Sequence, residues 1–183
     1  MPIILRPPLI ILAAGILVIA LTASARAPVR PVAVRIVDRH GHPATKDRFG
    51  DVVGNVQVTF SDGYRETWTR SLRCELPKVS ASGVVGWTYA AGRHSRGAWM
   101  NEVLCIARSR NDITRFAADR AFIELWAFTE HDSCVVMRSR NIHGPSWIEQ
   151  FRIATGEFVA SCSGSNYPEQ TPDWAKPYLD DDQ

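Results

Sequence analysis

Two histidines stand at equivalent places in a repeated part of this chain, and they are the first residues to consider for chemistry. His94 and His143 lie 49 residues apart, each in a Gly-containing loop between two expected strands. Because the loops of repeated β-units line one rim, this spacing predicts a shared binding surface there. Trp99 and Trp147 lie at the edges of the same loops, and their rings would add an aromatic surface for a glycan or a peptide.

The other histidines and the usual catalytic motifs give no second candidate. His40 and His42 have the spacing of a weak metal chelate, but a solvated turn is the favoured interpretation. His131, Asp132 and Ser133 are adjacent, so a single turn cannot give them the geometry of a catalytic triad. The sequence lacks GxSxG, HExxH and a phosphate-binding Gly loop. It therefore predicts no catalytic residue, no metal site and no cofactor.

Carboxylates offer an alternative hypothesis. A pair of Asp or Glu side chains flanking one bond is what glycoside hydrolysis needs. Four glutamates on expected strands could supply such a pair, and their spacing selects no two of them: Glu66, Glu75, Glu124 and Glu149. The alternative function is thus an exported hydrolase acting on envelope glycan or peptide, in which such acids converge with His94 or His143. The sequence leaves open whether the protein is an enzyme.

The four cysteines, Cys74, Cys105, Cys134 and Cys162, are spaced 31, 29 and 28 residues apart. An even number of cysteines in an exported chain favours structural disulfides. Three connectivities remain open, although Cys134 and Cys162 begin and end strands that a third strand separates, which disfavours that pair. CxxC spacing for zinc is missing, and oxidation would remove a thiol nucleophile.

Residues 1–27 are predicted to be a secretory signal peptide and not part of the fold. Arg6 precedes the apolar run Leu9–Leu21, and the segment ends in Ala25-Arg26-Ala27. These are the three parts of such a peptide, with cleavage expected after Ala27 or, alternatively, after Ala25. The apolar run is shorter than the roughly 20 residues that a membrane span needs. We expect export to the periplasm or the exterior, without stable membrane insertion after cleavage.

Charge excludes one class of partner. Of the 21 Lys and Arg residues, Arg6 and Arg26 lie in the predicted signal peptide, which leaves 19 against 19 Asp and Glu in the mature chain. A chain with a net charge near zero has no electrostatic basis for binding nucleic acid. The expected partners are a protein, a peptide or an envelope glycan.

The elements that position these residues are predicted to be short β-strands. The clearest stretch is 122–162, which reads as four strands separated by turns: Phe122–Thr129, Cys134–Met137, Trp147–Ile153 and Glu157–Cys162. Upstream strands follow from the same alternation and from Gly turns: Val32–Val37, Asn55–Phe60, Tyr64–Thr69, Glu75–Lys78, Gly83–Tyr89, Glu102–Arg108 and Ile113–Ala117. We expect one all-β domain over residues 28–162 and an extended tail over 163–183, which wraps an open blade edge through Trp174.

The strands repeat. With an offset of 49 residues and small gaps, three strands of one unit overlie three strands of the next: Glu75-Leu76 on Glu124-Leu125, Val84–Trp87 on Cys134–Met137, and Glu102–Ala107 on Trp147–Arg152. Four-stranded units with a period of about 40–50 residues are typical of propeller blades. The turns Ser61-Asp62-Gly63 and Thr155-Gly156 resemble those of secreted WD40-like or TolB-like propeller repeats. A WD dipeptide is missing, so the resemblance concerns architecture. The chain also resembles small exported bacterial proteins of unknown function, which implies no activity.

The number of blade-like units in the chain determines which assembly we predict. A closed propeller needs at least about four blades, and this chain holds about two and a half units of that period. We therefore predict antiparallel, blade-like meanders that form a monomeric partial propeller. A β-sandwich, or a homodimer that completes the ring, is the alternative. The predicted function is an exported, non-catalytic binding or interaction module.

Overall fold

The computed structural model describes residues 27–93, 99–164 and 168–179. All of the predicted signal peptide except Ala27 lies outside these ranges, and so do His94 and the acidic end Asp180–Asp182. Among the helices in the described ranges, none is long and apolar enough to cross a membrane.

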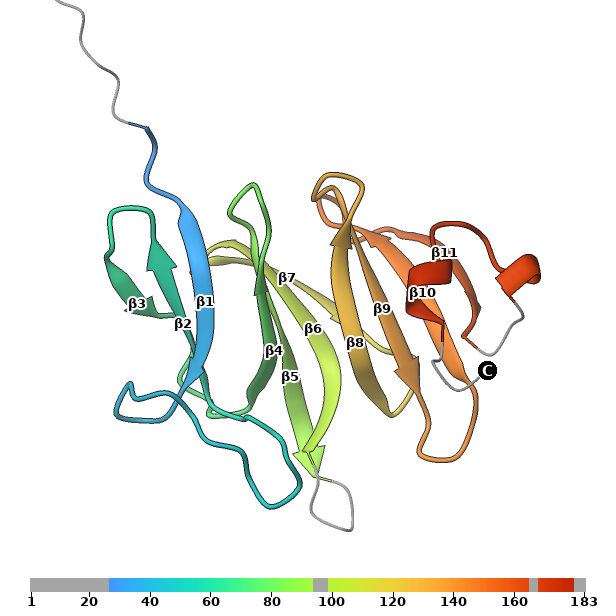
Figure 1. Cartoon of the computed structure of the whole chain (residues 1–183), viewed down its shortest axis with the longest axis horizontal. Coiled ribbons are helices and arrows are strands. Elements are labelled where there is room, and N and C mark those ends of the chain that lie inside the picture. The colour runs from blue at the N-terminus through green and yellow to red at the C-terminus, as the bar shows by residue number, and fades with distance from the viewer. Residues whose placement is uncertain (1–26, 94–98, 165–167, 180–183) are drawn as a thin grey trace, which may run out of the picture.

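The described chain folds into three antiparallel sheets, in which neighbouring strands follow each other in the sequence. The first sheet holds β1 (Pro31–Val37), β2 (Asn55–Phe60) and β3 (Arg65–Thr67). The second holds β4 (Cys74–Val79), β5 (Val85–Arg93), β6 (Trp99–Ser109) and β7 (Asp112–Ala117). The third holds β8 (Phe122–Thr129), β9 (Cys134–Arg140), β10 (Ser146–Arg152) and β11 (Phe158–Ser163). Figure 1 shows the three sheets in sequence order across the molecule.

This arrangement confirms the predicted all-β fold class and the repeat. Glu75 and Glu124 lie in the first strands of the second and third sheets, and the other aligned segments fall in β5 with β9 and in β6 with β10. Each of these sheets is a four-stranded meander of the size of a propeller blade. The described strands form no closed barrel, so the molecule is an open stack of blade-like sheets.

Two predicted hairpin turns illustrate how local sequence sets these meanders. At Ser61-Asp62-Gly63, the backbone N–H of Phe60 donates to the carbonyl of Tyr64 over 2.8 Å, and Gly63 has a φ of 86°. At Thr155-Gly156, Gly156 has a φ of 73°. Glycine adopts such positive φ values at low cost, and it therefore allows the chain to reverse direction between two strands.

The hydrophobic core forms two layers between the sheets. The layer between the first and second sheets contains Ile36, Val56, Val58 and Trp68 on one side and Cys74, Val85, Trp87, Cys105 and Ala107 on the other. The layer between the second and third sheets contains Leu104, Ile106 and Phe116 against Ile123, Trp126, Val135, Met137 and Ile153. Since each strand buries alternate residues, the second sheet contributes one face to each layer.

The two outer faces of the stack differ in chemistry. On the first sheet, Arg35, Gln57 and Thr67 form one cross-strand row, and Thr59 pairs with Arg65 in the next. The Arg35 guanidinium donates to the side-chain oxygen of Gln57 over 2.9 Å. This face is polar, so water can cover it.

On the third sheet, the C-terminal segment covers the outer face. It contains two 3-10 turns, Pro168–Gln170 and Lys176–Tyr178. Ala175, Trp174, Tyr178 and Leu179 pack on an apolar patch formed by Val136, Ile148 and Cys162. The predicted contact through Trp174 is present, but the segment covers a sheet face, whereas an edge was expected.

The predicted disulfides are not formed, and all four cysteines are free. Cys74 on β4 and Cys105 on β6 are separated by β5, and Cys134 on β9 and Cys162 on β11 are separated by β10. Strands two positions apart are about 9.6 Å apart, whereas a disulfide needs Cα atoms within about 7 Å. Cys74 and Cys105 pack in the layer between the first and second sheets, whereas Cys162 packs under the C-terminal segment. The structure therefore contradicts the disulfide prediction.

Candidate ligand-binding pocket

A pocket of about 510 Å³ lies on the face of the second sheet that meets the first sheet. Its lining combines aromatic rings, two thiols and two guanidinium groups: Trp68, Thr69, Arg70, Ser71, Cys74, Trp87, Tyr89, Val103, Cys105, Ile113 and Arg115. A concave, mainly apolar site with a few polar groups is what small ligands and side chains occupy in proteins. We call it the aromatic pocket.

Strand register builds the floor of the aromatic pocket. Trp87 on β5 pairs with Cys105 on β6, which pairs with Arg115 on β7. Residues paired across neighbouring strands point to the same face, so these three side chains form one row. A second row contains Cys74, Tyr89 and Val103. The floor is therefore rigid, because every member stands on a hydrogen-bonded strand.

The roof is the connection between β3 and β4. Its first residue, Trp68, donates its indole N–H to the Glu66 carboxylate over 3.1 Å, and its backbone N–H donates to the carbonyl of Val56 over 2.8 Å. The hydroxyl of Thr69 accepts the backbone N–H of Val56 over 2.9 Å. Glu66 also pairs with Arg110, with 2.9 Å between Oε1 and Nη1. Since β3 has only three residues, this connection, and not a strand, closes the pocket.

The charge at the mouth of the aromatic pocket is positive. Arg70 and Arg115 line it, and both side chains are exposed. Within the described residues, Arg70 has no hydrogen bond or ion pair, and Arg115 contacts the Cys105 thiol. The nearby negative charge of Glu66 is already paired with Arg110. Two cations without acidic partners in the described chain favour an anionic group at this mouth.

The two thiols of the pocket are poor nucleophiles. Burial raises the pKa of the Cys105 thiol to about 11, although the neighbouring Arg115 guanidinium acts in the opposite direction. Burial also raises the pKa of Cys74, whereas its side-chain hydrogen bonds with Thr69 and Ser71 act in the opposite direction. Since the thiolate is the reactive form, both residues are protonated near neutral pH and serve as small apolar lining groups.

A second, polar hollow of about 570 Å³ adjoins the aromatic pocket. The two share Thr69 and Arg70 in their linings. Leu72 of the β3–β4 connection also lines the hollow, and the rest of the lining comes from the β1–β2 connection and the first sheet: Asp38, Arg39, His40, Gly41, Asn55, Gln57 and Thr67. Arg70 thus stands at the boundary between an apolar site and a polar one.

The residues that the sequence singled out for binding lie elsewhere. His143 is exposed in the loop between β9 and β10, and Trp147 at the start of β10 is half-buried. The Arg120 guanidinium lies 5.0 Å from the centroid of the Trp147 ring and covers one of its faces. Trp99 begins β6 opposite Arg93, and His94 is outside the described residues. A joint binding role for His94, His143, Trp99 and Trp147 stays a prediction.

The four glutamates considered for hydrolysis are not brought together by any contact in the described chain. Each has its own partner: Glu66 binds Trp68 and Arg110, Glu75 binds Asn101, Glu124 binds Arg138 and Arg140, and Glu149 binds Ser139. Burial raises the pKa of both Glu75 and Glu149. Each of these carboxyls binds a neighbouring side chain of the fold, and no two of them form the acid–base pair that hydrolysis needs.

The remaining histidines occupy turns. Asp38 accepts the backbone N–H groups of His40 and His42 over 2.7 and 3.0 Å, and the Arg39 guanidinium donates to Nε2 of His40 over 3.0 Å. That nitrogen is therefore already used and does not face a metal. In the described part of the chain, no group of three or more His, Cys, Asp or Glu side chains could hold a metal ion.

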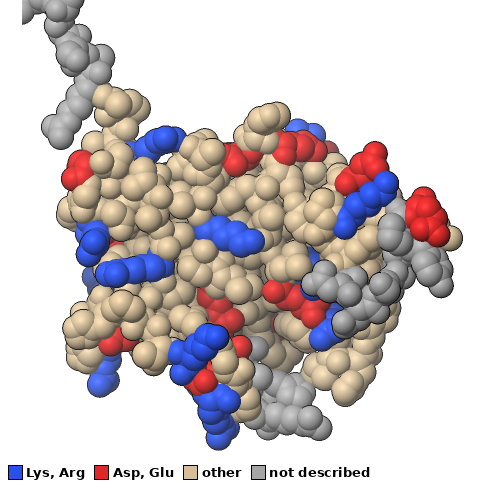
Figure 2. Space-filling model, in the orientation of Figure 1, with Lys and Arg blue, Asp and Glu red and all other residues tan. Residues whose placement is uncertain are grey.

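A search of known proteins finds no family model and no curated protein that matches this chain. Function must therefore be argued from the site itself. Charge on the face shown in Figure 2 is mixed, with acidic and basic side chains interspersed.

Sequence reasoning missed the aromatic pocket. The alternation of Trp87 with Tyr89, and of Val103 with Cys105, was a signal that β5 and β6 share an aromatic and apolar face. The sequence contains no signal that this face lies under the Trp68–Ser71 connection, because that contact joins two different sheets.

Proposed function

We propose that this chain is an exported, non-catalytic binding module of the partial-propeller type that the WD40-like or TolB-like resemblance implies, and that it binds an apolar group in the aromatic pocket. Export rests on the predicted signal peptide. The observation that carries the binding function is the lining of the pocket, in which Trp68, Trp87 and Tyr89 surround an open volume of about 510 Å³. Aromatic side chains supply large contact areas with little loss of conformational freedom.

The chemistry of the pocket favours binding over catalysis. The two thiols of its lining, Cys74 and Cys105, have raised pKa values because they are buried. Among the described residues, no His or carboxylate lines the aromatic pocket, so this part of the chain places no general base in the lining beside either thiol. The alternative, an exported hydrolase, lacks support from the partners of the four glutamates in the described chain, and we do not favour it.

Fragment binding tests this function. We expect small neutral aromatic compounds such as benzyl alcohol to bind the mature protein weakly, with a Kd in the millimolar range, which corresponds to about −4 kcal/mol. Ligand-observed NMR would detect this binding. The Val103→Phe variant places a larger side chain in the pocket, and it should abolish the signal because the ring fills the volume that the fragment needs.

Val159→Phe is the matched control. Val159 is 40% exposed on β11 and does not line the pocket, so this variant should bind fragments as the parent chain does. If Val103→Phe keeps its thermal transition and still binds fragments like the control, the aromatic pocket is not the binding site.

A further inference from the structure

We infer that the ligand of the aromatic pocket is the carboxyl terminus of a peptide whose last side chain is apolar, an inference that rests on the proposed binding function. The ligand must match three features of the site: the apolar pocket, its cationic mouth and the polar hollow that adjoins it. A C-terminal residue has the matching parts, since its side chain, its carboxylate and the preceding peptide groups diverge from one Cα atom.

The side chain would occupy the aromatic pocket. Trp87 and Tyr89 stand on neighbouring rows of the floor, and Val103 and Ile113 complete the apolar lining. Trp87 is only 2% exposed, so the ring is held in place by the core and is preorganised for a ligand. An aromatic or branched aliphatic side chain would bury its surface here.

The carboxylate would bind at the mouth. Arg70 has no hydrogen bond or ion pair with the described residues, and within them the Arg115 guanidinium hydrogen-bonds only the Cys105 thiol. Guanidinium groups bind carboxylates through two parallel hydrogen bonds. Tyr89 also lines the pocket, and its hydroxyl donates no hydrogen bond within the described chain. A cationic ligand would meet two like charges at this position.

The preceding residues of the peptide would extend over the polar hollow. Arg70 and Thr69 line both sites, so a carboxylate held by Arg70 lies where the two meet. Within the described residues, the side-chain NH₂ groups of Asn55 and Gln57 donate no hydrogen bond. They are available to peptide carbonyl oxygens, and they distinguish a peptide from a short free acid, which would not reach them.

A series of matched peptides tests this inference by isothermal titration. The first probe is acetyl-Gly-Ser-Gly-Phe with a free carboxyl group, the second is its C-terminal amide, and the third ends in Ser in place of Phe. The free acid should bind about tenfold more tightly than either of the others, which corresponds to about 1.4 kcal/mol. Phenylpropanoate, a free acid of similar shape, should bind more weakly than the first peptide.

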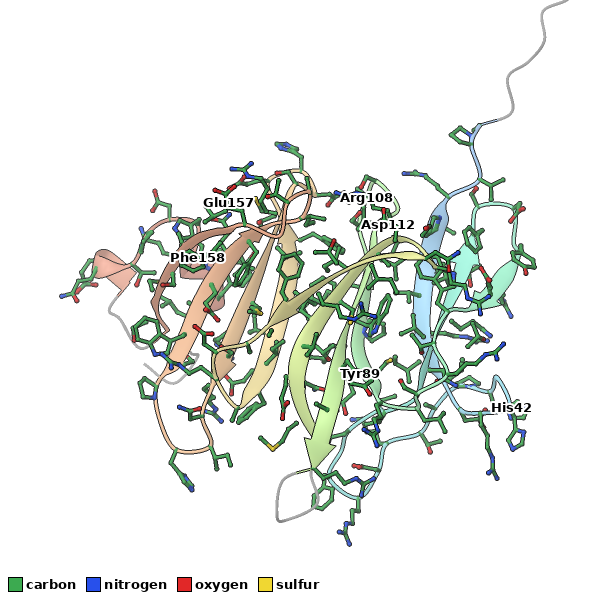
Figure 3. All side chains as sticks on the ribbon, turned by 180° about the vertical axis from the view of Figure 1, so that it is seen from behind. His42, Tyr89, Arg108, Asp112, Glu157 and Phe158 are labelled. Carbon is green, nitrogen blue, oxygen red and sulfur yellow. The ribbon has the colours of Figure 1, made fainter. Side chains whose placement is uncertain are left out.

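Two arginine variants separate charge recognition from simple loss of fold. Arg70→Gln and Arg115→Gln should each reduce the preference for the acid over the amide, whereas Arg108→Gln should retain it. Arg108 is exposed and does not line the pocket, and Figure 3 shows it near Asp112 at the β6–β7 turn, well separated from Tyr89. Circular dichroism would confirm that the variants remain folded.

The inference is wrong if the amide binds as tightly as the acid, whether both bind or neither does. It is also wrong if phenylpropanoate binds as tightly as the peptide, because the ligand is then a small acid. These outcomes leave the pocket function standing. That function fails separately if Val103→Phe changes neither fragment nor peptide binding.

Discussion

Glu75 is a buried side chain whose ionisation makes the stability of the fold depend on pH. Glu75 is 7% exposed and Asn101 is 8% exposed. The Asn101 amide donates to Oε2 of Glu75 over 2.6 Å, which leaves Oε1 of Glu75 and Oδ1 of Asn101 buried without a donor. Burial raises the pKa of Glu75, and the charges of Asp51 and Asp47 add to the rise. A protonated Glu75 would supply the missing donor.

We therefore expect Glu75→Gln to stabilise the protein at neutral pH. The pKa of Glu75 is raised above 4.5 in the folded state, so the folded state binds more protons than the unfolded state just above pH 4.5. Stability is thus lost as pH rises from 4.5 through the folded pKa. Glutamine does not titrate, so the variant should have a higher unfolding free energy than the parent chain at pH 7 and the same unfolding free energy below pH 4.

Urea unfolding at pH 4 and pH 7 measures this effect, with Glu157→Gln as the control. Glu157 has a side chain that is 66% exposed and is visible near Phe158 at the surface in Figure 3. Its replacement should change stability little at either pH. A loss of stability in Glu75→Gln at pH 7 would mean that Glu75 is ionised and needed as a carboxylate.

At the scale of elements, the contact between the second and third sheets depends on a glycine. Gly86 on β5 faces Trp126 on β8, and a Cβ atom at position 86 would lie 2.4 Å from Cη2 of Trp126 and 2.6 Å from Cδ1 of Ile106. Trp126 is fully buried, and its indole N–H donates to the carbonyl of Leu76 on β4 over 2.9 Å. The ring is thus held from both sides and cannot move away easily.

Gly86→Ala should therefore lower the unfolding free energy by about 1–3 kcal/mol, because it overpacks a core. Gly92→Ala is a matched control in the same strand, since no atom lies within 4 Å of its added Cβ; it should change stability by less than about 0.5 kcal/mol. Thermal denaturation would compare the two. Adding Trp126→Phe to Gly86→Ala should cost less than the sum of the single changes, because the smaller ring leaves space. Simple additivity would contradict the proposed clash.

At the scale of the whole molecule, the two outer faces of the open stack decide whether copies of this chain would associate. A large exposed apolar face is a site of association. Here the outer face of the first sheet is polar, and the C-terminal segment covers the apolar patch on the third. Arg138 holds this segment, since its Nη1 atom donates to the carbonyls of Tyr178 and Leu179 over 3.2 and 2.8 Å. Glu124 in turn pairs with Nε of Arg138 at 3.2 Å.

We expect the mature chain to be monomeric and a chain that ends at Gly164 to self-associate. Truncation would expose the patch formed by Val136, Ile148 and Cys162. Light scattering under native conditions, with and without reductant, would give the mass of each form. Asp173→Ala is the control, because the Asp173 side chain is 94% exposed and its ion pair with Lys176 lies at the surface. A truncated chain that remains monomeric, or a full mature chain that is dimeric, would contradict this account.

Much of the fold could be predicted from the sequence because its signals are local. Alternation of apolar residues along β2 and β10 and the Gly turns at Gly63 and Gly156 depend on neighbours only a few residues away. The repeat also follows from the chain alone, since equivalent strands recur at a constant spacing. These local features were sufficient to predict the strands, their antiparallel order in the sheets and the blade-like architecture.

The tertiary structure alone decided which faces meet. An even number of cysteines favoured disulfides in the sequence, yet β5 separates Cys74 from Cys105 in the folded sheet. Trp68 and Trp87 read as ordinary core residues, yet the short β3 leaves an open volume between them. Such outcomes depend on how sheets stack and how far each strand extends, and residues distant in sequence set both. The sequence by itself therefore determined the strands and their repetition, whereas the pocket, its charged mouth and the covered outer face arose only when the sheets packed together.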